Sequence, residues 1–405
     1  MNRLNLNPML ENIWPAYLQV CRVLPGEANL TWRAETVGRW EGFLEMVEGE
    51  GVASLLYWRL KDGRWPAAMP EAVRGELTGA YYNTVAQNTL LLQELFKVLD
   101  AFAMADIPVI VLKGAALVGR FYEDIGLRPM HDLDLLIPDR QVTQAMGLVQ
   151  TLGYQPAEEE ISPGINRQLA HNTYWRGGPD GRVGLELHWN LIASQADDRT
   201  VQMDWFWQQV EILPGVGTRY STRQLPQLCP TAHLLYLAAH LMLRHGGGNE
   251  RLIWYYDVDR VIRSGQVDWV MVQQEAQALG WSALVRYVLQ GAAARFATPI
   301  PAELLESISG EEDWQEFLAA RQKMIGRSRL DTGRSRLDST WKSLEHFPWP
   351  LRLRAIFALI FPRPAYIRWR YAPRPAWTWP LYYPYRWWDV SKELLRAVFP
   401  EAGQA

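Results

Sequence analysis

The 405-residue chain has little cysteine, with only Cys21 and Cys229. Two cysteines cannot form the disulfide framework of a small secreted protein, and their spacing fits no zinc site. Long apolar runs are lacking too, since the longest, around 234–243 and 355–361, are far too short to span a bilayer. The segment Met1–Trp14 has no apolar core of a signal peptide. We therefore expect a cytoplasmic protein with no transmembrane segment.

A large excess of charge of one sign is also missing. The chain has 41 Lys and Arg against 44 Asp and Glu, for a formal net charge of −3. This balance argues against a protein that coats nucleic acid through bulk charge, although a local basic face is compatible with it. With 48% hydrophobic and 21% charged residues, the composition is typical of a globular protein long enough for two or three domains.

The hydrophobic period changes along the chain and predicts its organisation. Apolar residues recur at three and four up to about residue 102, and the stretch 70–102 suits one extended helix or two. The pattern then changes to β-branched and alternating runs before helical periodicity returns after about residue 197. The predicted fold class is α+β, with a small mixed sheet between helical regions. The predicted units are residues 1–102 (helical), 103–195 (mixed α/β), 196–325 (helical) and 326–405 (linker and Pro/aromatic-rich arm).

The α/β unit alternates strands and helices. Its expected elements are strands at 107–112 and 130–137, helices at 115–122 and 139–152, and further strands near 154, at 172–176 and at 183–189. Four helices are expected after it, at 232–243, 252–262, 268–279 and 283–296. A short tandem repeat at 326–338 is polar and is expected to form a linker or surface loop.

Acidic side chains on two of these strands are the candidate site. Alternation along a strand places Asp132 and Asp134 on one face, with Leu133 and Leu135 directed into the core. Two carboxylates held this close repel each other unless a cation lies between them, and Mg²⁺ prefers one or two carboxylates plus phosphate oxygens. Glu186 is a third carboxylate on a later strand. Such a pair is also common as an ordinary polar strand face.

Three segments in order resemble a known family. They are Leu112-Lys113-Gly114, then Leu127-Arg-Pro-Met-His-Asp-Leu-Asp-Leu-Leu136, then Leu185-Glu-Leu-His-Trp189. The chain resembles the uncharacterised nucleotidyltransferase family of bacteria, within the DNA polymerase β-like superfamily. The likeness covers roughly residues 80–300 and includes the stretches 240–245 and 251–257. It implies that residues 103–195 form a nucleotidyltransferase core.

The resemblance also implies roles for individual residues. Asp132 and Asp134 would be catalytic and hold metal ions that bridge the nucleotide phosphates, and Glu186 would complete one metal site and help activate the acceptor hydroxyl. Lys113, Gly114 and Arg128 are the nucleotide-binding candidates. Lys113 is otherwise an exposed lysine that closes a strand, and Arg128 a structural ion-pair partner of Glu123 or Asp124.

The turn departs from the superfamily pattern, because Ala115 stands where a Gly or Ser usually follows the glycine. The hydroxyl contact to the triphosphate is therefore missing, although backbone N–H groups at the helix start can hold phosphate.

The histidines leave alternatives open. His188 either orients Glu186 or is a satisfied strand histidine. The spacing of His233, His240 and His245 does not place all three on one helical face, so helix-packing or substrate-side roles are favoured over metal binding. Arg251 and Asp257 are expected to form a helix–helix pair.

The C-terminal segment from Phe347 to Trp388 is dense in Trp, Tyr, Pro and Arg. Its prolines are expected to prevent a long amphipathic helix. An extended arm whose rings pack back onto the helical domain is favoured. Contact with a membrane surface or with single-stranded nucleic acid is possible but not favoured.

The predicted function is Mg²⁺-dependent transfer of a nucleoside monophosphate from an NTP to an unidentified hydroxyl or phosphate acceptor. AMP from ATP is the expected group. The alternative is a nucleotide- or substrate-binding accessory protein that keeps the fold without turnover.

Overall fold

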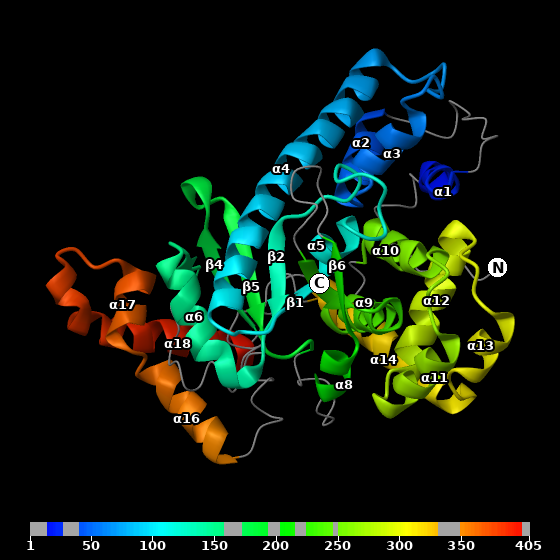
Figure 1. The fold of residues 1–405 in the computed structure, drawn as a ribbon. Coiled ribbons are helices and arrows are strands. Elements are labelled where there is room, and N and C mark those ends of the chain that lie inside the picture. The colour runs from blue at the N-terminus through cyan, green and yellow to red at the C-terminus, as the bar shows by residue number, and fades with distance from the viewer. Residues whose placement is uncertain are drawn as a thin grey trace.

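The computed structural model describes residues 14–26, 40–157, 172–192, 203–214, 224–245, 250–330 and 349–398. Its centre is a seven-stranded mixed β-sheet with helices around it, which confirms the α+β fold class (Figure 1). The strands are β1 Ile110–Leu112, β2 Asp132–Leu136, β3 Gln155–Pro156, β4 Asn172–Gly177, β5 Val183–His188, β6 Val210–Pro214 and β7 Gln224–Leu228.

The sheet order is β3-β4-β5-β2-β1-β7-β6. The strand β2 lies between β1, to which it is antiparallel, and β5, to which it is parallel. The register pairs Asp134 with Leu112 on one side and with Glu186 on the other. This pairing brings the end of β1 and two acidic strand positions to one place in the sheet.

The N-terminal region is helical, as predicted. It contains α1 Trp14–Val23, α2 Trp40–Gly49, α3 Ala53–Leu60 and α4 Glu71–Met104. The periodic stretch at 70–102 is one continuous helix of 34 residues rather than two. In Figure 1, α4 runs from the other N-terminal helices to the sheet.

Two hydrophobic clusters explain this arrangement. The second half of α4, including Leu95 and Phe102, packs with sheet residues such as Leu133 and Leu185 in one cluster. The first half of α4 belongs to a second cluster, which also contains α1–α3 and the helices that follow the sheet. The single long helix therefore spans both cores.

The helices after the sheet match the predicted positions closely. They are α9 Pro230–His245, α10 Leu252–Arg263, α11 Trp269–Ala278 and α12 Ser282–Phe296, followed by α13 Ala302–Ser307 and α14 Glu311–Leu330. Within the α/β unit, α5 Lys113–Val118 is shorter than the helix expected at 115–122, and α6 Val142–Thr151 agrees with the expected one. Residues 326–330 of the tandem repeat form the end of α14, and the rest of the repeat lies outside the described residues.

Two strands were not predicted. After α8 Met203–Gln208, the strands β6 and β7 form a hairpin within the range assigned to helices. The strand β7 also pairs in parallel with β1 through Val111 and Gln227. The sheet therefore extends beyond residue 195.

The prediction of an extended C-terminal arm is wrong. Residues 349–398 form α16 Trp349–Ile360, α17 Pro364–Tyr371, a 3₁₀ segment Ala376–Leu381 and α18 Tyr382–Val398. Proline is tolerated in the first turn of a helix, because the N–H groups there have no partner within the helix. Pro364 begins α17 and Pro384 is the third residue of α18, so these prolines lie where helices can start.

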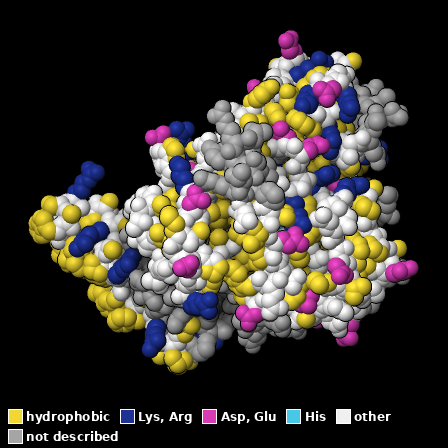
Figure 2. Space-filling model, in the orientation of Figure 1, with side chains coloured by type: hydrophobic (Ala, Val, Ile, Leu, Met, Phe, Trp, Pro, Cys, Tyr) yellow, Lys and Arg dark blue, Asp and Glu magenta, His cyan; other side chains and the backbone are white. Residues whose placement is uncertain are grey.

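In Figure 1 the C-terminal helices lie on the opposite side of the molecule from α11–α13. Figure 2 shows yellow and dark-blue side chains gathered over this part of the surface. Within the described ranges, no helix is long and apolar enough to cross a membrane.

Candidate active site

The turn formed by Lys113 and Gly114, where β1 ends and α5 begins, has a special backbone geometry. Lys113 has a φ of +48°, in the left-handed region that side chains other than glycine rarely adopt. Gly114 follows at a point of close approach, where an added Cβ would lie 2.8 Å from Arg128 Nη1 and 2.8 Å from Met130 Cγ. Only glycine fits there without movement of its neighbours. The turn thus packs directly against the segment that leads into β2.

The strand β2 presents its carboxylates as the alternation predicted. Leu133 and Leu135 are fully buried in the core of the sheet. Asp132 and Asp134 both line a pocket on the other side of the strand. Asp134 is 2% exposed, whereas Asp132 is only partly buried.

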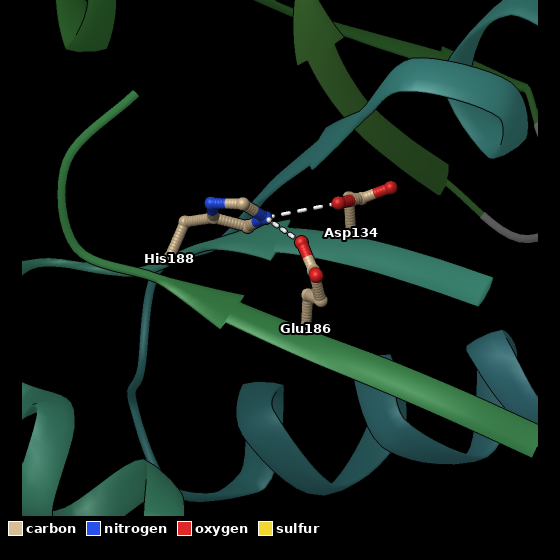
Figure 3. A group of neighbouring side chains, drawn as sticks. All are labelled: Asp134, Glu186 and His188. Atoms are coloured by element: carbon tan, nitrogen blue, oxygen red, sulfur yellow. Dashed lines mark hydrogen bonds and ion pairs between the residues drawn. The ribbon is translucent and has the colours of Figure 1, made fainter. Parts of the chain in front are cut away.

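The neighbouring strand β5 adds Glu186 and His188 to this group. His188 Nε2 lies 2.9 Å from Asp134 Oδ1 and 3.0 Å from Glu186 Oε2, so the imidazole bridges the two carboxylates (Figure 3). The ligand-capable atoms of Asp134, Glu186 and His188 lie within 4.8 Å of one another. The hypothesis that His188 orients Glu186 therefore agrees with the geometry.

Lys113 supplies the positive charge of the group. Its Nζ lies 2.6 Å from Asp134 Oδ1 and 3.6 Å from Glu186 Oε2. The side chain is 20% exposed, so it is not the exposed lysine of the alternative interpretation. The unusual φ of Lys113 and the pairing of Leu112 with Asp134 place this ammonium over the carboxylates.

These contacts shift the acidities in opposite directions. Burial disfavours ionisation of Asp134, but Lys113 and the hydrogen bond from His188 hold its pKa well below the ordinary value. Glu186 is also buried, and the hydrogen bond from His188 lowers its pKa. Burial acts against a charged His188, but its hydrogen bonds to the two carboxylates raise its pKa. These contacts therefore favour the ionised forms of Asp134 and Glu186, which share the proton of His188 and the charge of Lys113.

Asp132 behaves differently. Burial and the charge of Asp134 raise its pKa to about 6. The local cations are committed to Asp134 and Glu186, so an additional cation is what would keep all three carboxylates ionised.

Arg128 has another partner than expected. It donates through Nη2 to Asp257 Oδ2 at 2.9 Å and through Nε to Asp257 Oδ1 at 3.3 Å. Asp257, on α10, is 1% exposed and also accepts from the Tyr122 hydroxyl at 2.5 Å. Arg128 thus ties the loop before β2 to the helical region.

The structure corrects two ion pairs that the sequence suggested, one between Arg128 and Glu123 or Asp124 and one between Arg251 and Asp257. Glu123 accepts from Trp58 Nε1, and Asp124 accepts from the Tyr81 hydroxyl, so neither pairs with Arg128. Arg251 does not pair with Asp257 but donates to the backbone carbonyl of Gly49 at 2.6 Å. Sequence spacing could not show these partners, because each contact joins segments far apart in the chain.

The pocket lies where three parts of the chain meet. It has a volume of about 260 Å³, and its wall combines Lys113, Gly114, Arg128, Asp132, Asp134 and Glu186 with residues from elsewhere. The N-terminal region contributes Gly51, and the helical region contributes His240, Arg251 and Trp254. All six predicted site residues therefore line one pocket.

The histidines of α9 separate in the structure. His240 lines the pocket, in agreement with a substrate-side position. His233 is fully buried with its ring edge-on to Phe121, which is a packing position. The side chain of His245 lies outside the described residues.

Sequence reasoning missed His131 and Tyr174. His131 lines the pocket between Met130 and Asp132, and its position inside the acidic motif was the available signal. Tyr174 on β4 pairs with Glu186, and its hydroxyl covers Gly184, the residue opposite Asp132. Only the strand register reveals that Tyr174 borders the carboxylates.

The donor set fits a hard divalent cation. Asp134 and Glu186 contribute carboxylate oxygens at one point, and Asp132 adds another on the same pocket wall. Mg²⁺ binds oxygen ligands and commonly takes one or two carboxylates plus phosphate oxygens. Burial and, after it, the negative charge of Asp134 raise the pKa of Asp132, and a bound cation would favour its ionised form.

A comparison with protein families identifies the family of the chain. Residues 37–297 match the family described as "Uncharacterised nucleotidyltransferase". The match covers more than half of the chain and includes every residue of the pocket described above. The chain belongs to this nucleotidyltransferase family.

Solved structures with detectable similarity include two nucleotidyltransferase-type proteins. The antibiotic-resistance factor ANT(2'')-Ia, known from a solution structure, is 14% identical, with a TM-score of 0.33 over 51% of this chain and 98% of its own. An antigenic nucleotidyltransferase-like protein from Paracoccidioides brasiliensis is 16% identical, with a TM-score of 0.32 over 52% and 93%. No curated protein sequence matches the chain significantly.

Proposed function

We propose that the protein is a Mg²⁺-dependent nucleotidyltransferase that moves AMP from ATP to a hydroxyl or phosphate acceptor. The observation that carries this proposal is the placement of Asp134 opposite Glu186 on paired strands, with Asp132 on the same pocket wall beside the Lys113-Gly114 turn. Carboxylates from two adjacent strands next to a cationic turn are suited to a metal-bound triphosphate.

Asp132, Asp134 and Glu186 would hold the metal in this proposal. The bound metal supplies charge neutralisation at the phosphate oxygens and alignment of the reacting groups. His188 fixes the orientation of Asp134 and Glu186 through its two hydrogen bonds. Lys113 lies beside the carboxylates. Once a metal ion neutralises these carboxylates, the ammonium is available to a phosphate oxygen bound at the same place.

The transfer itself is an in-line displacement at phosphorus. The acceptor oxygen forms a bond to the α-phosphorus, and the bond from that phosphorus to the oxygen bridging to the β-phosphate breaks. Pyrophosphate leaves with the bonding electrons. Glu186 takes the acceptor proton, and His188, at 3.0 Å from Glu186, stabilises the carboxyl group that results.

Gly114 and Arg128 have complementary positions in binding. Gly114 lets the turn pack closely against Arg128 and Met130 on the pocket wall, where a larger residue would meet both side chains. Arg128 has its charge largely balanced by Asp257, so its contribution is to hold the pocket wall and to offer directed N–H groups.

One observation favours the alternative of an accessory protein without turnover. The Lys113 ammonium lies 2.6 Å from Asp134 Oδ1, where the metal ion itself would be expected, and Ala115 offers no hydroxyl to the triphosphate. If Lys113 stays in place, nucleotide can bind near the turn without reaching a competent metal site.

Label transfer from ATP separates the two functions. Purified protein is incubated with Mg²⁺, a cell extract as the source of acceptor, and ATP labelled on either the α- or the γ-phosphate. The proposal predicts that α-label enters an acceptor, that γ-label appears in pyrophosphate, and that Asp134→Asn abolishes both.

The matched control is Asp62→Asn, which changes an exposed carboxylate outside the pocket. It is expected to keep wild-type activity. ATP binding without label transfer in any extract would support the accessory function, and transfer that survives in Asp134→Asn would contradict the proposed site.

A further inference from the structure

The C-terminal helices carry an unusual amount of exposed apolar surface. Sixteen large apolar side chains are exposed in the described ranges, and ten of them lie between residues 349 and 388. Trp377 is 74% exposed, and Trp349 and Phe357 are each 64% exposed. Single exposed apolar residues are ordinary, but a concentrated group of this kind marks an interaction surface.

Five of these residues form a continuous line, which we name the aromatic stripe: Trp349, Leu353, Phe357, Phe361 and Trp387. The first three are spaced by four residues and therefore share one face of α16, and Phe361 follows directly after that helix. The ring centroids of Phe357 and Phe361 are 5.1 Å apart, and Trp387 meets Phe361 edge-on at 5.7 Å. Trp387 joins α18 to the stripe.

The opposite side of α16 is occupied. Ala355 and Ala358 are 2% and 5% exposed, so α16 already buries an inward face against the rest of the C-terminal helices. The aromatic stripe is therefore a second, outward face of the helix.

The same segment is strongly basic. Residues 349–392 contain eight Lys or Arg and one acidic residue, a net charge of +7, whereas the remaining residues sum to −10. The exposed basic residues are Arg354, Arg368, Arg370, Arg374 and Lys392. Figure 2 shows dark-blue side chains next to yellow ones over α16 and α17.

We propose that residues 349–392 bind the surface of an anionic lipid bilayer, with the aromatic stripe in the interface and the basic side chains against the headgroups. Helices that lie in a membrane surface combine an apolar face rich in Trp, Phe and Leu with Lys and Arg on the polar side. Trp and Tyr favour the headgroup level, and each nearby Lys or Arg adds attraction to anionic lipid.

Two other partners fit the surface less well. Single-stranded nucleic acid binds in a basic groove with stacking rings, but the stripe is convex helix surface that includes the aliphatic Leu353. A second copy of the chain in a symmetric contact would bring two segments of charge +7 together, which is repulsive.

Vesicle flotation of the full chain tests the proposal. The probes are vesicles of phosphatidylcholine alone and vesicles of phosphatidylcholine and phosphatidylglycerol in equal parts. We expect retention on the anionic vesicles only, with loss at high salt.

Two sets of variants test the two parts of the surface. Leu353→Glu with Phe357→Glu is expected to weaken binding at least about tenfold, because both side chains leave the interface. Arg368→Gln, Arg370→Gln and Arg374→Gln are expected to weaken it about fivefold for each charge removed. The matched control is Ile212→Glu with Val270→Glu, which changes exposed apolar residues outside the segment and is expected to leave binding unchanged.

Circular dichroism and thermal melting establish that each variant is folded. Failure of the folded wild type to float with anionic vesicles overturns the proposal, as does equal binding to both vesicle types. Dimerisation through the stripe, seen in sedimentation and lost in Leu353→Glu, would assign the surface to a second copy instead. ATP binding by the same preparations reports separately on the proposed function.

Discussion

Lys113 is the residue whose side chain sets the charge at the candidate site. Its ammonium compensates the charge of Asp134 and lies within reach of Glu186. Burial alone would lower the pKa of Lys113, but the acidic groups around it, Asp134 foremost, together outweigh burial and raise it. In this position the Lys113 ammonium can either contact a nucleotide phosphate or compete with a metal ion for Asp134. Substitution distinguishes these two roles.

We expect Lys113→Gln to weaken Mg²⁺-dependent ATP binding by about tenfold or more, because a charge-assisted contact to phosphate is lost. Isothermal titration with ATP and with Mg²⁺ alone measures both affinities. The control is Lys97→Gln, which removes an exposed lysine that pairs with Glu94 in α4. Unchanged ATP affinity combined with tighter Mg²⁺ binding would show instead that Lys113 competes with the metal.

Gly114 is the second residue whose identity the geometry explains. An added methyl group would contact Arg128 and Met130 at 2.8 Å, and Arg128 cannot retreat without disturbing its pair with Asp257. We expect Gly114→Ala to lower the free energy of unfolding by about 1–3 kcal/mol through overpacking.

Gly147→Ala is the matched control, since Gly147 lies within α6 and an added Cβ there meets nothing within 4 Å. It is expected to stabilise the protein by roughly 0.4–1 kcal/mol. Urea unfolding measures both variants. Equal effects of the two substitutions would contradict the close approach at the turn.

At the scale of elements, α9 contains a buried histidine that makes stability depend on pH. Burial is the main cause that lowers the pKa of His233 to about 3, and Arg120 adds to the effect. In the described structure neither ring nitrogen of His233 has a hydrogen-bond partner. The folded protein therefore resists protonation there, whereas the unfolded chain binds a proton near the ordinary pKa of about 6.5.

The sign follows from this difference. At neutral pH His233 is neutral in both states and adds no pH dependence. As the pH falls below about 6.5 the unfolded state gains a proton that the folded state refuses, so stability falls by up to about 1.4 kcal/mol per pH unit. We expect His233→Leu to flatten this acid limb between about pH 6 and pH 4. Urea unfolding across that range measures the slope, and an unchanged slope in the variant would refute the assignment.

The elements that the sequence predicted best are those with a clear period. The helix at 70–102, the acidic strand at 130–137 and the four helices after residue 230 were all found, because each buries one face against a core. The shared pocket position of Asp132 and Asp134 was predictable for a related reason, since alternation along β2 places both side chains on one strand face.

Other elements gave misleading signals. The strand β7 contains Pro226, and a proline argues against a strand that lies between two others. The prolines of the C-terminal segment suggested an extended arm, yet Pro364 and Pro384 fall in first turns of helices. Contacts such as Arg128 with Asp257 depend on tertiary packing, which no local pattern encodes.

At the scale of the whole molecule, the N-terminal helices and the helices after the sheet share one hydrophobic cluster. The pocket lies between them and the sheet, since Gly51, Trp254 and Glu186 all line it. The domain boundaries at 102, 195 and 325 stay a prediction, and the shared core implies that the first and third units fold together. Nucleotide binding is therefore expected to require both helical regions.

The central claim is a metal-dependent nucleotide site on β2 and β5. The most direct measurement is titration of the full chain with ATP, with and without Mg²⁺, for the wild type and for Asp132→Asn with Asp134→Asn. The account predicts ATP binding that depends on Mg²⁺ and is lost in the double variant while Asp62→Asn binds normally. ATP binding that is independent of Mg²⁺ and unchanged in the double variant would contradict it.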